Sequence, residues 1–335
     1  MALRQLLEEE NKRKADPTDT HGRSIIVLGS RGVGKSTMIC RFLEKDEPSK
    51  PTIAMDYSFG RKTGRSLIKD VVHVWEIGHL SSSLVAAAMT GSALVHSPHH
   101  VTLLVMLDLG KPEILWSTLE ECLMVIRSAV KMSYDASTID SLRERMRGGE
   151  RGLEFDKTLD PLPIRTCILG GRYDVFKDYD EDKKRLVGRT LRGVAHSLGA
   201  GLRYHSSKDT VLIRKTKDLL SHYGFGSQRP KAGCTDYDKP LAVPPGTDSF
   251  SSIDPTLTGG TGSAILDSMK QTYVAHIPQD SKGSYGVKPE DPSNDPNFQE
   301  PTVDRLKSQR EEEISVLLRD MLEGRVSKIA IPGPL

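Results

Sequence analysis

Residues 29–37, GSRGVGKST, combine closely spaced glycines with one lysine and two hydroxyl side chains. The spacing G-x-x-x-x-G-K-S, after an apolar run and before a helical pattern, is typical of a Walker A loop. Glycines let successive N–H groups point at phosphate oxygens, Lys35 would neutralise phosphate charge, and the Ser36 hydroxyl would bind Mg²⁺. The predicted phosphate-binding residues are Gly29, Gly32, Val33, Gly34, Lys35, Ser36 and Thr37. A glycine-rich turn without a ligand is the alternative.

Such a loop needs a strand before it and a helix after it, and the rest of the sequence repeats this alternation. Continuous apolar runs predict strands that are buried on both faces. These runs span residues 24–29, 71–77, 101–109, 164–170 and 201–207. Helical patterns between them span residues 35–45, 112–132, 179–198 and 208–222. The alternation predicts an α/β fold with a doubly wound, mostly parallel sheet.

Changes in composition predict how the chain is divided. A stretch rich in Pro, Gly, Ser, Asp and Thr buries too little apolar surface to offset the entropy lost on ordering, so we expect it to be extended. We expect an N-terminal charged helix or arm (1–20), followed by a globular domain (21–226). Within that domain, a polar insertion (about 134–163) holds at most one short helix. After this domain we expect an extended linker or strap on a partner (227–300), an amphipathic helix (301–324) and a tail (325–335).

The predicted C-terminal helix has an apolar stripe among many charged residues. Val303, Leu306, Ile314, Leu317 and Met321 lie near one face at helical spacing. Either a partner helix covers this stripe, or the helix folds back on its own domain or stays mostly solvated.

Composition excludes several classes of function. Lys and Arg total 47 against 45 for Asp and Glu, so the net charge of +2 creates no global field that would attract nucleic acid or an anionic membrane. The four cysteines are widely spaced without a C-x-x-C pair, which argues against zinc and a disulfide framework. The N-terminus lacks the apolar core of a signal peptide, and no run approaches the roughly 20 apolar residues of a membrane span. We expect a soluble intracellular protein.

Two further positions could complete a Mg²⁺ site. Thr52, in KPTIAMDYSFG, could reach the metal from a loop, or it belongs to a Pro-Thr turn that leads into a strand. Glu76 stands where Ras-like GTPases, which the order of these motifs resembles, have the aspartate of Asp-x-x-Gly. It either binds the metal through water or only caps the strand. Gly78 comes one residue early, no glutamine follows to orient the attacking water, and His79 is a poor replacement.

Arg31 occupies the position in the phosphate loop where rapid GTPases carry glycine. A side chain there normally obstructs hydrolysis, so the resemblance implies slow or absent turnover. The alternative role, an arginine finger in cis, would still lack a glutamine to position the water.

The Ras-like family recognises its base after the fifth strand with Asn-Lys-x-Asp, and here the text is GGRYDVF. Asp174 is kept, whereas Gly171 and Arg172 replace the first two residues. The later HSSKDT resembles the family's Ser-Ala-Lys loop. The resemblance implies GTP or GDP with Mg²⁺ as the ligand and a weakened preference for guanine. The base-binding residues that it implies are Arg172, Asp174, Ser207 and Lys208, with Ser206 beside them.

Longer segments carry a more specific resemblance. KPTIAMDYSFGR, HVWEIG, LVMLDLGKPEILWSTLEE and RYDVFKDYD closely resemble the light intermediate chains of cytoplasmic dynein 2, the motor of retrograde intraflagellar transport. The resemblance covers roughly residues 20–250 and continues more loosely in DPSNDPNFQEPTVDRLKSQRE.

This resemblance implies a non-catalytic subunit whose Ras-like domain packs on the dynein 2 heavy-chain tail and stabilises it. The implied complex also contains intermediate and light chains and rides intraflagellar transport trains. It would be found in the cytoplasm, the cytoskeleton and the cilium or flagellum, including the basal body. A nucleotide in the eroded site would then be structural.

Two rival functions and one contact surface complete the expectations. An active Ras-like GTPase switch that regulates ciliary trafficking would need a way to position water, which the sequence does not provide. A P-loop kinase would need a second substrate site or an arginine-rich lid. Arg185, Arg189 and Arg192 lie at helical spacing and form either a heavy-chain contact or a solvated basic face.

Overall fold

The computed structural model describes residues 22–46, 48–63, 69–90, 98–147, 159–228, 230, 233–254, 262–280 and 296–325. The chain divides into two units, Met1–Val287 and Lys288–Leu335. The predicted N-terminal arm (1–20) lies outside the described residues, as does the predicted tail after its first residue.

A seven-stranded sheet forms the centre of the first unit, in the order β2-β3-β1-β4-β5-β6-β7. The strands are β1 (Gly22–Gly29), β2 (Met55–Thr63), β3 (Lys69–Ile77), β4 (Val101–Asp108), β5 (Arg165–Gly171), β6 (Gly201–Tyr204) and β7 (Ala242–Val243). The five central strands run parallel, and the edge strands β2 and β7 run antiparallel to their neighbours. The apolar runs predict these five parallel strands, so the α/β fold with a mostly parallel sheet is confirmed.

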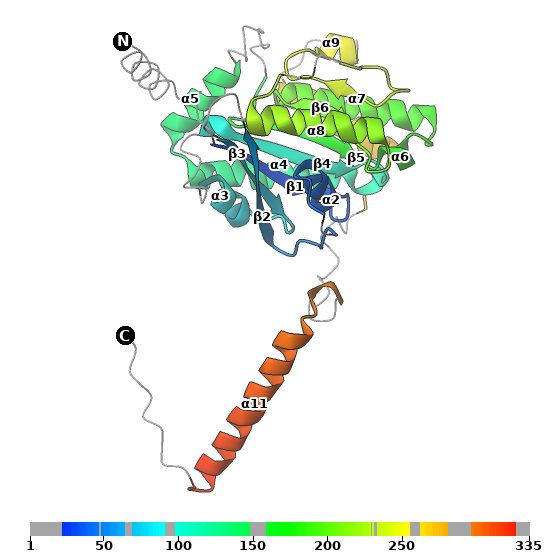
Figure 1. The fold of residues 1–335 in the computed structure, drawn as a ribbon. Helices are drawn as coiled ribbons and strands as arrows, with labels where there is room; N and C mark the ends of the chain where they lie inside the picture. Colours follow the sequence, from blue (N-terminus) through cyan, green and yellow to red (C-terminus); the bar gives the residue numbers. More distant parts are fainter. Residues whose placement is uncertain are drawn as a thin grey trace, which may run out of the picture. The chain divides into compact units, whose positions relative to one another are not determined.

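Helices cover both faces of this sheet, as a doubly wound fold requires (Figure 1). They are α2 (Lys35–Phe42), α3 (Ser82–Thr90), η1 (Pro98–His100), α4 (Pro112–Ser133), α5 (Ala136–Arg147), α6 (Tyr173–Phe176), α7 (Glu181–Ser197), α8 (Thr210–Phe225), α9 (Phe250–Ile253) and α10 (Gly262–His276). Helices α2 and α8 pack on the face that carries Ile25 and Val27. Helices α3, α4 and α7 pack on the opposite face, which carries Ile26 and Leu28.

Much of the expected linker, residues 227–300, packs onto the first unit, and this part of the prediction is wrong. The segment contains β7, α9 and α10. Four apolar side chains at four-residue spacing are buried along α10 and just beyond it. They are Ile265, Met269, Tyr273 and Ile277. The sequence on either side of α10 is rich in Pro, Gly and Ser, so the average composition hides this periodic stripe.

The segment after α10 is fixed to the start of α4. The Tyr273 hydroxyl donates to the Pro112 carbonyl at 2.9 Å. The Gln279 side-chain oxygen accepts from the Trp116 N–H at 3.1 Å, in the second turn of α4. The chain is therefore held to the sheet domain as far as residue 280.

Further features of the fold concern the insertion, the cysteines and the lengths of the helices. The insertion at about 134–163 contains one helix, α5, within its described part. All four cysteines are free thiols. None of the helices that the structure describes is long and apolar enough to cross a membrane.

The second unit contains η4 (Pro296–Phe298) and α11 (Pro301–Leu322). The helix predicted at 301–324 is thus confirmed, and none of its residues is buried. Its exposed apolar residues include Val303, Leu306, Ile314 and Leu317, whereas Met321 is half-buried. A partner for this stripe stays a prediction.

Candidate nucleotide site

The phosphate loop joins β1 to α2 and adopts a backbone that only glycines accept easily. Gly29, Gly32 and Gly34 have φ values of 129°, 71° and 101°. A Cβ on Gly29 would lie 2.0 Å from the Met106 carbonyl oxygen, so the loop passes directly against β4. The next N–H, of Ser30, donates to that same oxygen at 2.8 Å. The start of the loop is therefore fixed to the neighbouring strand β4.

Lys35 begins α2 and folds back over this loop. Its Nζ donates to the carbonyl oxygens of Gly29 and Ser30, each at 3.0 Å, and the side chain is buried. Burial lowers the pKa of Lys35, although the nearby Glu76 carboxylate opposes the shift. An ammonium group has three N–H donors, so one is left for a phosphate oxygen. Lys35 is thus where the Walker A motif predicts it.

Ser36, Thr52 and Glu76 come together beside the loop. The Ser36 hydroxyl donates to Glu76 Oε1 at 2.8 Å, and the Thr52 side chain also hydrogen-bonds to Glu76. Burial raises the pKa of Glu76, and the bonds from Ser36 and Thr52 and the charge of Lys35 oppose the shift. Hydroxyl and carboxylate oxygens are ligands that Mg²⁺ accepts. The donor set therefore fits Mg²⁺ held together with nucleotide phosphates, although the ligand roles stay predictions.

The parallel register explains how Glu76 reaches this place. Val27, near the end of β1, pairs with Glu76 on one side and with Leu104 on the other. Because the carboxyl ends of parallel strands meet at one edge of the sheet, the last residues of β3 lie beside the loop that follows β1. The described residues contain no cluster of three or more His, Cys, Asp or Glu that could hold a metal by itself.

Thr52 belongs to a segment that is fixed to the end of β3. A Cβ on Gly78 would lie 2.1 Å from the Thr52 carbonyl oxygen, and the Gly78 N–H donates to the Ala54 oxygen at 2.8 Å. The predicted alternative, a turn that leads into a strand, is also present, since β2 begins at Met55. Thr52 therefore both precedes a strand and lies beside the Glu76 carboxylate, to which the Ser36 hydroxyl also bonds.

The two residues considered for a role in hydrolysis lie at the surface. Arg31 is exposed at the tip of the phosphate loop, and His79 is exposed after β3. The His79 N–H donates to the Ala54 oxygen at 3.3 Å, which fixes its backbone beside β2. The sequence contains no glutamine between residues 71 and 97 that could replace the missing water-positioning group.

The base end brings together residues from two separate loops. The Ser206 hydroxyl donates to Asp174 Oδ1 at 2.7 Å, and Lys208 Nζ lies 3.1 Å from Asp174 Oδ2. Burial disfavours the charged form of Asp174, but the bonds from Ser206 and Lys208 outweigh it and lower its pKa. Ser207 contributes its carbonyl oxygen, which accepts from Arg41. Asp174 and Lys208 therefore meet, with Ser206 beside them, whereas base contacts stay a prediction.

Arg172 does not extend freely into the site. It adopts a left-handed backbone with φ 58° before α6, and its Nη1 donates to Asp108 Oδ2 at 3.3 Å. The sequence analysis missed Asp108, a buried carboxylate at the end of β4. The backbone N–H of Asp108 donates to Ser30 Oγ at 3.1 Å, so Asp108 joins the base loop to the phosphate loop. An acidic residue that ends the apolar run VTLLVMLD is the signal that was available.

Gly171 stands where the Asn-Lys-x-Asp motif of Ras-like GTPases has asparagine, and neighbouring side chains fill the space around it. A Cβ there would lie 2.6 Å from Val33 Cγ2 and 3.1 Å from Met106 Cε. The phosphate loop thus packs directly on the end of β5, in the space that an asparagine would need.

Two of the three arginines of α7, Arg189 and Arg192, have a different role from either predicted one. The Arg192 guanidinium forms two hydrogen bonds of 2.8 Å to Asp248 and one of 2.8 Å to the Tyr237 hydroxyl, and both charged side chains are buried. Arg189 pairs with Asp254. Arg185 is exposed. For Arg189 and Arg192 both expected roles are wrong, because these side chains hold the segment after α8 against α7.

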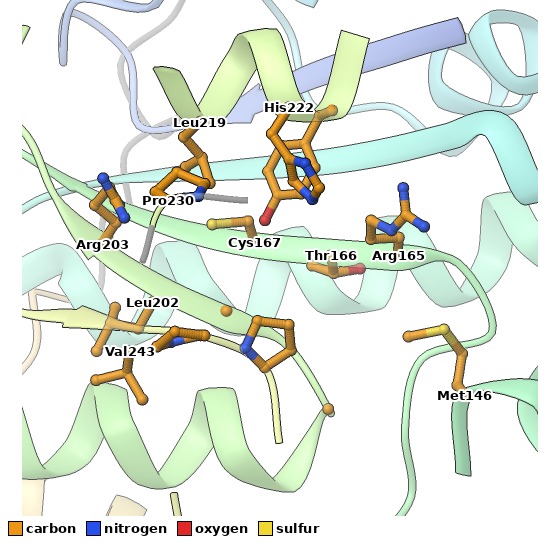
Figure 2. A pocket seen from close by; sticks show the side chains of 15 residues that line it. Met146, Arg165, Thr166, Cys167, Leu202, Arg203, Leu219, His222, Pro230 and Val243 are labelled. Carbon is orange, nitrogen blue, oxygen red and sulfur yellow. The ribbon is translucent and has the colours of Figure 1, made fainter. Parts of the chain in front are cut away.

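A partly open cavity of about 50 Å³ lies at the other end of the sheet, among the first residues of β5 and β6. Figure 2 shows Arg165, Thr166 and Cys167 on one strand, Leu202 and Arg203 on the next, and Leu219 and His222 on α8. The cavity thus lies at the amino ends of these parallel strands. It is therefore separate from the candidate site at the carboxyl ends of the strands.

Comparisons with known proteins find relatives named cytoplasmic dynein 2 light intermediate chain 1. The Danio rerio protein is 32% identical over 327 residues, which are 93% of this chain and 90% of that protein. The Mus musculus protein is 33% identical over 329 residues, covering 91% and 92%, and the Homo sapiens protein is 32% identical over 321 residues, covering 91% and 90%. No model of a protein family matches the chain.

A solved structure supports the fold independently. The crystal structure of the conserved domain of a dynein light intermediate chain matches with a TM-score of 0.56, covering 84% of this chain and 99% of that one. Its sequence identity is 16%, so this likeness concerns the fold alone.

Proposed function

The chain belongs to the family of cytoplasmic dynein 2 light intermediate chains, and we propose that it is a non-catalytic subunit of the dynein 2 motor that stabilises the heavy-chain tail. The observation that carries the proposal is the extent of the similarity. It spans at least nine-tenths of both chains in the zebrafish, mouse and human comparisons, so it is not limited to the phosphate loop that many unrelated proteins share.

The finer parts of the proposal concern place and partners. The subunit would work with the intermediate and light chains of dynein 2 on intraflagellar transport trains. It would be found in the cytoplasm and cytoskeleton and in the cilium or flagellum, including the basal body. The balanced charge of the chain supports association with proteins rather than with nucleic acid or a membrane.

We propose further that the site holds GTP or GDP with Mg²⁺ as a structural ligand with slow or absent turnover. The phosphate loop would hold the phosphates through its N–H groups and Lys35, while Ser36, Thr52 and Glu76 would hold the metal. Bound Mg²⁺ would screen the phosphate charge. The absence of a water-positioning glutamine and the attachment of the Thr52 segment to β3 support a static ligand rather than a switch.

The first experiment is quantitative mass spectrometry of the proteins that copurify with the tagged full chain from ciliated cells, without crosslinking. We expect near-stoichiometric dynein 2 heavy chain, with the tag alone as control. Recovery of GTPase regulators with no dynein chain would contradict the proposed function.

A second experiment tests the ligand. Nucleotide released from the purified, denatured chain is separated by chromatography and compared with that from Lys35→Ala and from Lys50→Ala, a matched loss of an exposed lysine. We expect guanine nucleotide in the wild type and in Lys50→Ala, and its loss together with a lower Tm in Lys35→Ala. Wild-type protein without nucleotide, and an unchanged Tm in Lys35→Ala, would remove the structural-ligand proposal.

One observation favours a second candidate, an active GTPase switch. Ser36, Thr52 and Glu76 lie together, as a functional metal site would require. Multiple-turnover phosphate release by the full chain, abolished by Lys35→Ala, would support this candidate. A flat trace would exclude it.

A further inference from the structure

Strand β2 forms one edge of the sheet and has only one neighbour, β3, among the strands that the structure describes. It is nine residues long, MDYSFGRKT, and contains no proline. An edge strand presents alternate N–H and C=O groups outward, where a further strand can pair with them. Proteins usually protect such an edge with proline, a short strand, charged side chains or a covering segment. In β2 the charged residues are Asp56, Arg61 and Lys62, and no other described strand covers the edge.

The two faces of β2 differ in how they are covered. On one face, Ser58 is buried and accepts from Lys45 Nζ at 2.7 Å, and a Cβ on Gly60 would lie 2.8 Å from Leu43 Cδ2. This face therefore packs on the α2 and α8 side of the domain. Asp56 and Lys62 lie on the same face, one near each end of the strand, and both are exposed.

The opposite face carries aromatic side chains that the domain leaves exposed. Tyr57 is 38% exposed and Phe59 is 49% exposed. Tyr57 packs on Trp75 of β3 with ring centroids 4.6 Å apart, and the Arg61 guanidinium lies 5.1 Å from the centre of the Phe59 ring. Large apolar side chains are exposed at six places in the described part of the first unit, and three of the six, Ile53, Tyr57 and Phe59, are in or next to this strand.

The order of residues in β2 is complementary to itself. When two copies of the strand are placed antiparallel about a two-fold axis at Phe59, each Asp56 lies opposite Lys62 of the other copy, and each Tyr57 lies opposite Arg61. Ser58 then faces Gly60, and the two Phe59 side chains face each other. Opposite charges and aromatic pairs directly across a sheet stabilise the pairing. We propose that β2 is a self-association edge, through which two copies of this chain join their sheets.

The charges favour a second copy in this one register. A shift of the pairing by two residues would place Asp56 opposite Gly60 and would lose both charge pairs. In the proposed register each favourable pair occurs twice, because a two-fold interface is isologous. This inference does not depend on a nucleotide or on the heavy chain, so it stands or falls separately from the proposed function.

Sedimentation velocity of the full chain over a range of concentrations measures the self-association. Asp56→Lys and Lys62→Asp would each replace two attractive pairs with two repulsive ones, and each should weaken the dimer about tenfold or more. The double variant, Asp56→Lys with Lys62→Asp, restores opposite charges across the axis and should return the dissociation constant close to that of the wild type. Because all these side chains are exposed, circular dichroism is expected to be unchanged.

A crosslinking experiment fixes the register. In a background with the partly exposed Cys40 and Cys234 replaced by serine, Phe59→Cys places two thiols opposite each other, within reach of a disulfide. Tyr57→Cys is the matched control, since its thiol would lie about 13 Å along the strand from its equivalent. We expect a crosslinked dimer for Phe59→Cys alone.

Three outcomes would overturn the inference. The first is a wild-type chain that is monomeric at every concentration. The second is a dimer that neither responds to the charge reversals nor crosslinks through Phe59→Cys, which would place the interface elsewhere. The third is a monomer whose capture of the heavy chain is lost in Phe59→Lys, which would assign the edge to a strand or helix of another protein.

Discussion

The phosphate end of the candidate site comes from one contiguous stretch of the chain, whereas the base end is assembled from the loops that follow β4, β5 and β6. At the phosphate end the shape is set by the backbone, because three glycines with positive φ and one buried lysine define it. At the base end the shape is set by side-chain bonds, from Arg172 to Asp108 and from Ser206 and Lys208 to Asp174.

This difference indicates how each end tolerates change. A methyl group on Gly29 would collide with a backbone oxygen of β4, so this close approach either persists or is lost as a whole. Side-chain bonds at a partly exposed end can be exchanged one at a time at small cost. The predictions below test this contrast, from the largest expected effect to the smallest.

Gly29→Ala should cause the largest loss. Its Cβ would lie 2.0 Å from a backbone oxygen, which cannot move without displacing β4. We therefore expect the free energy of unfolding to fall by about 4 kcal/mol, or the variant not to fold. The matched control is Gly32→Ala, which meets nothing within 4 Å and should cost about 1 kcal/mol for its positive φ. Equilibrium unfolding in urea measures both. Equal losses in the two variants would contradict the contact with β4.

His205 should make the base end sensitive to acid. Burial and the charge of Arg41 lower the pKa of His205 to about 4, while its Nδ1 lies 2.9 Å from Thr216 Oγ1. As the pH falls, His205 of the unfolded chain takes up a proton near pH 6.5, whereas His205 of the folded chain does so only near pH 4. The free energy of unfolding should therefore fall as pH decreases from 6.5 to 4, by about 3 kcal/mol from this group.

The test of this prediction compares the wild type with His205→Gln in urea at several pH values. The variant should have a flatter dependence on pH across this range, whatever its stability at pH 7. The same slope in both proteins would mean that His205 takes up its proton equally in the folded and unfolded states.

Gly171→Asn introduces the asparagine of the Ras-like Asn-Lys-x-Asp motif at the point where the base end of the site touches the phosphate loop. Because a Cβ there already lies 2.6 Å from Val33 Cγ2, we expect a destabilisation of about 2 kcal/mol rather than a braced loop. Gly171→Ala should cost less, since the Val33 and Met106 side chains can shift. Thermal unfolding of the three proteins ranks them, and a rise in Tm for Gly171→Asn would show that space for the amide exists.

Asp174→Ala and Lys208→Ala should have the smallest effects. Loss of Asp174 leaves the buried Ser206 hydroxyl without its acceptor, which should lower the free energy of unfolding by about 1 kcal/mol. Lys208 is 77% exposed, so its removal should cost less than about 0.5 kcal/mol. Urea unfolding of both variants gives the comparison. A larger loss for Lys208→Ala would indicate that the ion pair, rather than the hydroxyl bond, holds this end together.

The fold and the phosphate end were predictable because their signals are local. The strand, the glycines, Lys35 and Ser36 lie within fifteen residues of one another, and apolar runs mark strands that are buried on both faces. Strand β2 gave no such run, because as an edge strand it alternates between a packed face and an exposed one. Helix α10 was missed because its buried stripe lies among residues whose average composition resembles a linker.

The sequence by itself therefore determined a parallel α/β domain with a phosphate loop, free cysteines and a separate C-terminal helix. Only the tertiary structure decided that Arg192 meets Asp248 and that Asp108 joins the two ends of the site. The physical reason is separation along the chain. These partners lie tens of residues apart, and neither residue of a pair shows a local pattern that depends on the other. Packing alone brings them within hydrogen-bond distance.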